Sequence, residues 1–179
     1  MRVEWWEIVV PLVLLGIVGV WFFLPVVANG PPSLRVACLN NIRQIGLAMI
    51  MYAQDHEGAY PSSFGVLLKG GYLPTPRLLI CPASEDCIPE DFPEDFKSAD
   101  LHVLDSVEQW GSYVMVKGLT HEGRKDVIIL HDKPGNHGGE GRNCYFDDGH
   151  VRWLPEAEFQ RHMKVQQVKL REVRSGAPR

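Results

Sequence analysis

The chain has 179 residues, of which 45% are hydrophobic and 22% are charged, and its formal net charge is -4 at pH 7. These values are ordinary for a folded protein. They argue against binding to nucleic acid, which rests on clustered Lys and Arg and often on interleaved aromatic residues. Length and composition therefore predict one modest domain and no nucleic-acid partner.

An apolar run without charged residues extends from Ile8 to Ala28. As a helix that rises about 1.5 Å per residue, about twenty such residues cross the roughly 30 Å hydrocarbon core of a bilayer. Tryptophan rings beside such a run act as anchors at the headgroups. We therefore expect a single membrane anchor over residues 1–30, with the lipid bilayer as its partner. The residues assigned to the anchor and its borders are Trp5, Trp6, Glu7, Trp21 and Pro25.

A cleaved signal peptide is the alternative interpretation of this run, since Val26-Val27-Ala28 offers small residues for a cleavage site. The run is longer than a usual signal-peptide core of about 7–15 residues. The preceding segment also carries Glu4 and Glu7, where a signal peptide would have basic residues. These two features favour an uncleaved anchor.

A long amphipathic helix is predicted after the Pro-Gly-rich stretch 29–33. Ser33 is a good N-cap, apolar residues recur at helical spacing from Leu34 to Ala53, and Gly58 ends the pattern. An irregular segment follows, with a short helical turn over 64–68, one strand over 78–81 and an exposed acidic loop over 83–99. The helix must bury one stripe, and the rest of the chain is available to cover it.

Four strands are predicted in the C-terminal half, over residues 111–116, 126–131, 143–146 and 150–154. Asp148-Gly149 between the last two runs is a strong hairpin signal, because glycine adopts a positive φ without penalty. Alternation along the third strand places Cys144 and Phe146 on one face and Tyr145 on the other.

The order of these elements, a long helix followed by a small antiparallel sheet, predicts an α+β fold. Pro155 should begin a short helix over 156–163. We expect a globular domain over residues 31–163 and a solvated, partly disordered basic tail over residues 164–179, which would suit an anionic partner.

The four cysteines are Cys38, Cys81, Cys87 and Cys144, and they have no C-x-x-C spacing, which argues against a zinc ribbon. In an oxidising compartment, Cys81 and Cys87 could close a short loop, and Cys38 with Cys81 is the other pairing considered. Cys144 lies in a predicted strand, where a free cysteine acts as a small hydrophobic residue.

One set of residues recurs in a recognisable pattern along the chain: Cys38, Asn41, Gln44, Cys81, Pro82, His137, Asp148 and Gly149. His137 is followed by nine residues before Asp147 and by ten before Asp148-Gly149. In this pattern the chain resembles the type IV pilin-like proteins, and more narrowly the pseudopilin-G-like branch that ends in an H-x9-DG motif.

The resemblance implies a pilin-like fold, in which an N-terminal helix lies half in the membrane and packs on an antiparallel sheet. It implies a single-pass protein of the bacterial inner membrane with its globular domain outside the cytoplasm. Other pilin-like subunits or components of a type II secretion system would be its partners. The chain departs from the family in its leader, because no Gly-Phe precedes the span and the nearest acid is Glu7. Processing by a prepilin peptidase is therefore not expected.

Histidine and aspartate side chains gather around the predicted end of the sheet, and such groups can bind a divalent metal or transfer protons. Turn formation explains the aspartates equally well, and the nucleophile-elbow and phosphate-loop patterns are absent from the sequence. We therefore expect no catalysis and no cofactor. If a metal site exists, His137, Asp148 and His150 are its predicted ligands. The full set is His131, Asp132, His137, Asp147, Asp148 and His150.

Overall fold

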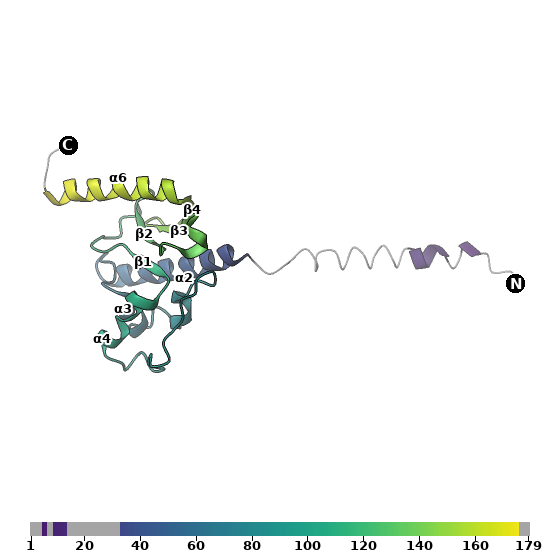
Figure 1. The fold of residues 1–179 in the computed structure, drawn as a ribbon, viewed down its shortest axis with the longest axis horizontal. Helices are drawn as coiled ribbons and strands as arrows, with labels where there is room; N and C mark the ends of the chain where they lie inside the picture. The colour runs from purple at the N-terminus through teal and green to yellow at the C-terminus, as the bar shows by residue number, and fades with distance from the viewer. Residues whose placement is uncertain (1–4, 7–8, 14–32, 176–179) are drawn as a thin grey trace. The chain divides into compact units, whose positions relative to one another are not determined.

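A computed structural model describes residues 5–6, 9–13 and 33–175. The chain divides into two compact units, Met1–Ser33 and Leu34–Arg179. The second unit contains the labelled helices and strands of Figure 1.

The predicted membrane span lies mostly outside the described residues, and so do Glu7, Trp21 and Pro25. Trp5 and Trp6 are described, and both side chains are exposed. Within the described ranges, no helix combines the length and the apolar content that a bilayer crossing requires.

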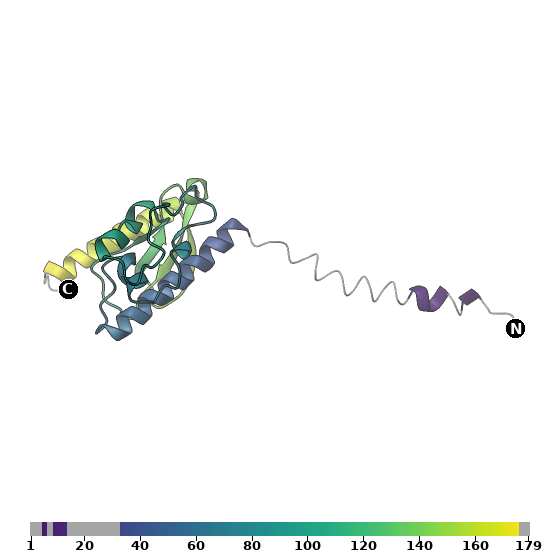
Figure 2. The same cartoon turned by 90° about the horizontal axis from the view of Figure 1, so that it is seen from below.

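Helix α2 (Leu34–Asp55) forms as its hydrophobic spacing predicts and appears in Figure 2 as one uninterrupted helix. Its buried positions recur every three or four residues, which makes a single buried stripe. Gly58 follows in a left-handed conformation (φ +85°), and its N–H donates to the carbonyl of Ala53. The buried residues are Cys38, Ile42, Ile45, Gly46, Ala48, Met49 and Ala53.

The second unit contains an antiparallel four-stranded sheet with the strand order β1-β2-β3-β4. This confirms the α+β class and the small antiparallel sheet predicted from the sequence. A bulge between Ile128 and Leu130 shifts the pairing of β2 with β3. The strands are β1 (Tyr113–Met115), β2 (Ile128–Asp132), β3 (Gly141–Phe146) and β4 (Val151–Pro155).

The predicted Asp-Gly hairpin joins β3 to β4. Gly149 has a φ of +91°, and its N–H donates to the carbonyl of Phe146 over 2.9 Å. The N–H of Phe146 donates in turn to the carbonyl of His150 over 3.0 Å. Glycine is required at this turn because its φ is one that L side chains rarely adopt.

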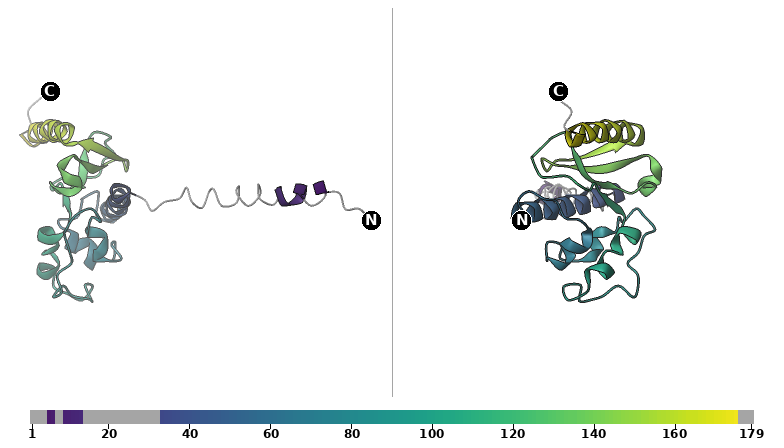
Figure 3. Two further views of the ribbon diagram at one scale, coloured as in Figure 1. Left: turned by 45° about the vertical axis from the view of Figure 1, so that its right-hand side comes forward. Right: turned by 90° about the vertical axis from the view of Figure 1, so that its left-hand side faces the viewer.

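Two helices cover the two faces of the sheet, with α2 on one face and α6 (Glu156–Ser175) on the other (Figure 3, right). Tyr145 of β3 faces α2, whereas Cys144 and Phe146 pack with Phe159 of α6. The predicted assignment of these three β3 side chains to opposite faces is therefore confirmed, and Cys144 is a free, buried cysteine.

The segment between α2 and β1 packs beside α2 and contains four short helices. The strand predicted over 78–81 is wrong, because a 3-10 turn forms there. Thr75 caps that turn by accepting a hydrogen bond from the N–H of Arg77, and Pro76 provides a φ suited to its first position. The four helices are α3 (Phe64–Lys69), η1 (Pro76–Leu79), α4 (Leu101–Leu104) and α5 (Val107–Trp110).

Helix α6 extends to Ser175, well beyond the predicted end at Met163, so the expectation of a partly disordered tail is wrong up to Ser175. Gln166 accounts for part of this length. Its side chain accepts from the N–H of Ile128 and donates to the carbonyl of the same residue, each over 2.8 Å. Tertiary contacts with β2 thus stabilise a helix that is too polar to be recognised from hydrophobic spacing.

Gly46 lets α2 approach the sheet closely, since a Cβ at this position would overlap the ring of Tyr145. Gly46→Ala should lower the free energy of unfolding by about 1–3 kcal/mol, because overpacking outweighs the better helix propensity of alanine. Urea denaturation of the full-length protein in detergent measures the change.

Gln44→Ala is the matched control, because Gln44 is exposed on the same helix. It should alter stability by no more than about 0.5 kcal/mol. A Gly46→Ala protein as stable as the control would show that the close approach of α2 to Tyr145 is not a packing constraint.

Candidate functional site

A disulfide joins Cys38, near the start of α2, to Cys81, which lies just after η1. Both cysteines are fully buried, and their Cα atoms are 5.1 Å apart. The side chain of Asn41 donates to the carbonyl of Ile80 over 3.0 Å, which holds the two segments together beside the disulfide.

The predicted pairing of Cys81 with Cys87 is wrong, because Cys81 is bonded to Cys38 and Cys87 is a free, exposed cysteine. Hydrogen bonds around Cys81 explain the difference. Its N–H donates to Ser112 Oγ over 2.8 Å, and its carbonyl accepts from both the N–H and the hydroxyl of Ser84. This turn leaves the Cys81 side chain buried against α2.

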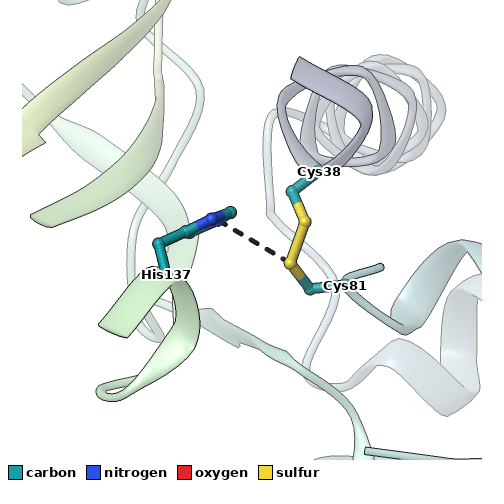
Figure 4. A group of neighbouring side chains, drawn as sticks. All are labelled: Cys38, Cys81 and His137. Carbon is teal, nitrogen blue, oxygen red and sulfur yellow. Dashed lines mark hydrogen bonds between the residues drawn. A yellow bond between two sulfur atoms is a disulfide. The ribbon is translucent and has the colours of Figure 1, made fainter. Parts of the chain in front are cut away.

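His137 lies beside the disulfide, with its Nε2 atom 3.7 Å from Cys81 Sγ (Figure 4). The residue belongs to η2 (Asn136–Gly139), a glycine-rich turn, and itself has a positive φ of +58°. The ring of Trp153 packs edge-on against the imidazole at a centroid distance of 5.4 Å. The left-handed backbone and the packed ring together fix the direction of the His137 side chain.

Asp132, at the end of β2, completes a polar cluster around His137. Its Oδ2 atom is 3.3 Å from His137 Nε2 and accepts a 2.7 Å hydrogen bond from the N–H of Asn143. The carboxylate is fully buried, and its Oδ1 atom has no hydrogen-bond partner among the described residues. An unpartnered buried oxygen of this kind is rare, which marks the cluster as a candidate functional site.

Burial dominates the electrostatics of this cluster. It raises the pKa of Asp132 to about 7, although hydrogen bonds from Asn143 and the charge of Arg142 oppose the rise. Burial also lowers the pKa of His137, with a smaller contribution from Arg35. Burial thus disfavours the charged form of both groups.

The cluster brings together donor atoms that are typical of metal ligands. Cys38 Sγ, Cys81 Sγ and a ring nitrogen of His137 all lie within 4.8 Å of one another. In the disulfide form the two sulfurs are bonded to each other, and metal binding by cysteine requires the thiolate. The arrangement therefore supports a structural crosslink as it stands and a soft-metal site only after reduction.

Asp147, which precedes the hairpin turn, forms a second buried centre. Its carboxylate accepts hydrogen bonds from Tyr60 Oη (2.5 Å), from the N–H of Glu122 (3.2 Å) and from both the N–H and Nε of Arg124 (3.0 and 3.1 Å). His121 Nδ1 lies 3.0 Å away. The hydrogen bonds to this one carboxylate hold the long loop between β1 and β2 against the β3–β4 hairpin, which is a structural role.

The predicted metal ligands do not come together. His137 lies in the turn before β3, whereas Asp148 and His150 lie in the hairpin after it and contact each other over 2.5 Å. The six-residue strand β3 lies between these positions, and at about 3.3 Å per residue its two ends are roughly 17 Å apart. Within the described ranges, the metal-capable group that contains His137 is formed with Cys38 and Cys81 instead.

The sequence analysis named Asp132 and His137 among six histidine and aspartate residues near the sheet end. It did not predict that either residue lies beside a cysteine.

The family-pattern residues also separate in space. Asn41 supports the disulfide, whereas Gln44 is exposed and its side chain donates to the carbonyl of Asn40 on its own helix. His131 points to the other sheet face, where its ring packs on Phe159.

Comparison of the chain with protein-family models, with curated proteins and with solved structures finds no match. The functional interpretation therefore rests on the sequence and on the geometry above.

The buried carboxylate of Asp147 makes the stability of the protein sensitive to acid. Burial would raise the pKa of Asp147, but hydrogen bonds from Tyr60, Arg124 and His121 outweigh it and lower the pKa to about 2. Because the folded pKa is depressed, the stabilisation is present above about pH 4 and should be lost as pH falls from about 4 to about 2.

Asp147→Asn should therefore lower the free energy of unfolding at pH 7 by about 3–5 kcal/mol, because it leaves the buried groups around it without their charged acceptor. It should also flatten the pH dependence between about pH 4 and 2. Urea denaturation at several pH values measures both effects. The neighbouring Asp148→Asn is the control, and equal losses for the two variants would contradict the role of Asp147.

Proposed function

We propose that the protein is a membrane-anchored, pseudopilin-like structural or assembly protein that works with a secretion- or pilus-type system. Its apolar N-terminal run holds it in the inner membrane. Its α+β domain, the unit Leu34–Arg179 that we call the head, lies outside the cytoplasm. The head presents surfaces to other subunits and performs no catalysis.

The fold supports this proposal in its general plan. A 22-residue helix follows the apolar run along the chain and packs on one face of an antiparallel sheet. This is the arrangement that the resemblance to pilin-like proteins implies. The Cys38–Cys81 disulfide adds support for a location outside the cytoplasm, because such bonds persist in oxidising compartments.

The exposed face of α2 offers a surface for subunit contact, and this observation carries the assembly part of the proposal. Val36, Leu47 and Met51 are 44%, 54% and 47% exposed. At about 100° per residue they fall within roughly 60° of one another around the helix axis. They form a stripe that the exposed side chain of Asn40 interrupts and that of Arg43 borders. We assign this stripe to contact with the same stripe of a second pilin-like subunit, because two membrane-anchored chains bring their helices to one height above the bilayer.

The two polar centres favour a structural role over a catalytic one. Asp147 is saturated by internal donors and connects the β1–β2 loop to the hairpin. Cys38 and Cys81 connect α2 to the segment before β1. Both centres therefore stiffen the head, which is what an assembly subunit requires.

Crosslinking in membranes tests the subunit contact. In a Cys87→Ser background, Leu47→Cys should yield a covalent dimer with a short bis-maleimide, because the stripe lies against that of a neighbour. Lys125→Cys, which is exposed on the β1–β2 loop, is the matched control and should give little product. Electrophoresis of the crosslinked membranes measures the yield.

Equal crosslinking at positions 47 and 125 would argue against α2 as the contact surface. A chain recovered entirely from the soluble fraction would contradict the anchor as well, and the two failures are distinguishable by fractionation before crosslinking.

A further inference from the structure

Three potential metal ligands, Cys38, Cys81 and His137, meet where the start of α2, the segment after η1 and the η2 turn come together (Figure 4). Asp132, at the end of β2, lies beside the His137 member of this group. We propose that, once the disulfide is reduced, Cys38, Cys81, His137 and Asp132 bind one zinc ion. The head would thus alternate between a disulfide form and a zinc form at the same place. This goes beyond the structural role proposed above.

Two donor distances, both from His137 Nε2, match the edges of a tetrahedral zinc site, and Asp132 would have to move closer to the sulfurs to complete it. With a Zn–S bond of about 2.3 Å and Zn–N and Zn–O bonds of about 2.0–2.2 Å, the sulfur-to-nitrogen edge is about 3.6 Å and the nitrogen-to-oxygen edge about 3.4 Å. Cys81 Sγ lies 3.7 Å from His137 Nε2, and that nitrogen lies 3.3 Å from Asp132 Oδ2. Two edges of the tetrahedron are therefore already formed.

Buried acceptors without partners point independently to a missing cation. Asp132 Oδ1 and Asn143 Oδ1 both lack a hydrogen-bond partner among the described residues. Asp132 is fully buried, and Asn143 Nδ2 lies 3.4 Å from His137 Nε2. A buried carboxylate with a spare oxygen is costly unless it is paired or binds a metal. The N–H of Asn143 already fixes the orientation of this carboxylate, as a supporting residue around a metal ligand does.

The charge balance of the site is favourable. A zinc ion with two thiolates, one carboxylate and a neutral imidazole carries a net charge of -1. Arg35 and Arg142 provide nearby positive charge, since Arg35 lies over the ring of Trp153 next to His137 and Arg142 acts on Asp132. Because Arg142 is itself paired with Glu156 over 2.7 Å, Arg35 offsets the remaining negative charge.

The change of state is a two-electron reduction followed by metal binding. A dithiol reductant transfers two electrons and two protons to the disulfide, the S–S bond breaks, and the reductant becomes a disulfide. Zinc then displaces the two thiol protons and forms two Zn–S bonds. The sulfurs separate to about 3.8 Å in a zinc tetrahedron. Rotation about the Cα–Cβ bonds allows this separation with the Cα atoms 5.1 Å apart.

Metal titration of the full-length, tag-free protein in detergent tests the proposal. The protein is reduced anaerobically with a phosphine, desalted, and incubated with Zn²⁺ or Co²⁺. The reduced protein should retain about one zinc per chain, and cobalt should give thiolate charge-transfer and tetrahedral d–d absorption. The oxidised protein should retain none.

Variants test whether zinc binds at this cluster and not at Cys87 or Cys144. A Cys87→Ser/Cys144→Ser protein should bind zinc as the wild type does. In that background, His137→Gln and Asp132→Asn should each weaken zinc binding by at least about tenfold, as loss of a ligand or of its support does. Circular dichroism of each variant confirms that it is folded.

Failure of the reduced, folded protein to retain zinc would overturn the proposal. Undiminished binding in both His137→Gln and Asp132→Asn would also overturn it, because the metal would then lie elsewhere. Neither outcome affects the membrane and crosslinking tests of the proposed function.

Discussion

The covalent link between Cys38 and Cys81 is the constraint on which the rest of the head depends. It fixes the start of α2 against the segment that precedes β1, and Asn41 reinforces the same junction through the carbonyl of Ile80. The sheet has only four strands, and β1 contains three residues. A core built on so small a sheet gains much from a crosslink, which removes freedom from the unfolded chain.

Two buried polar centres stabilise the head at opposite ends of β3. Asp147 organises the loop between β1 and β2 at the hairpin end of β3, and the cluster of Asp132, His137 and the disulfide lies at its opposite end. The first centre is fully satisfied by internal donors. The second keeps an unpartnered oxygen beside sulfur and imidazole, and this difference is why a ligand is proposed for one and a purely structural role for the other.

Local patterns predicted α2 and the β3–β4 hairpin, because hydrophobic spacing and an Asp-Gly turn act over a few residues. The partner of Cys81 could not be predicted, since it depends on how segments 43 residues apart in sequence pack together. The residue Asp147 was interpreted as a turn former, and its buried contacts come from residues 23 to 87 positions away. The length of α6 was missed for the same reason, because Gln166 stabilises the helix through contacts with β2.

Peptide mapping of the full-length protein, purified from membranes without reductant and with free thiols blocked at lysis, tests the central crosslink most directly. The account predicts a peptide pair joined through Cys38 and Cys81, with Cys87 alkylated before unfolding and Cys144 only after it. A bond between Cys81 and Cys87, or alkylation of both Cys38 and Cys81, would contradict it.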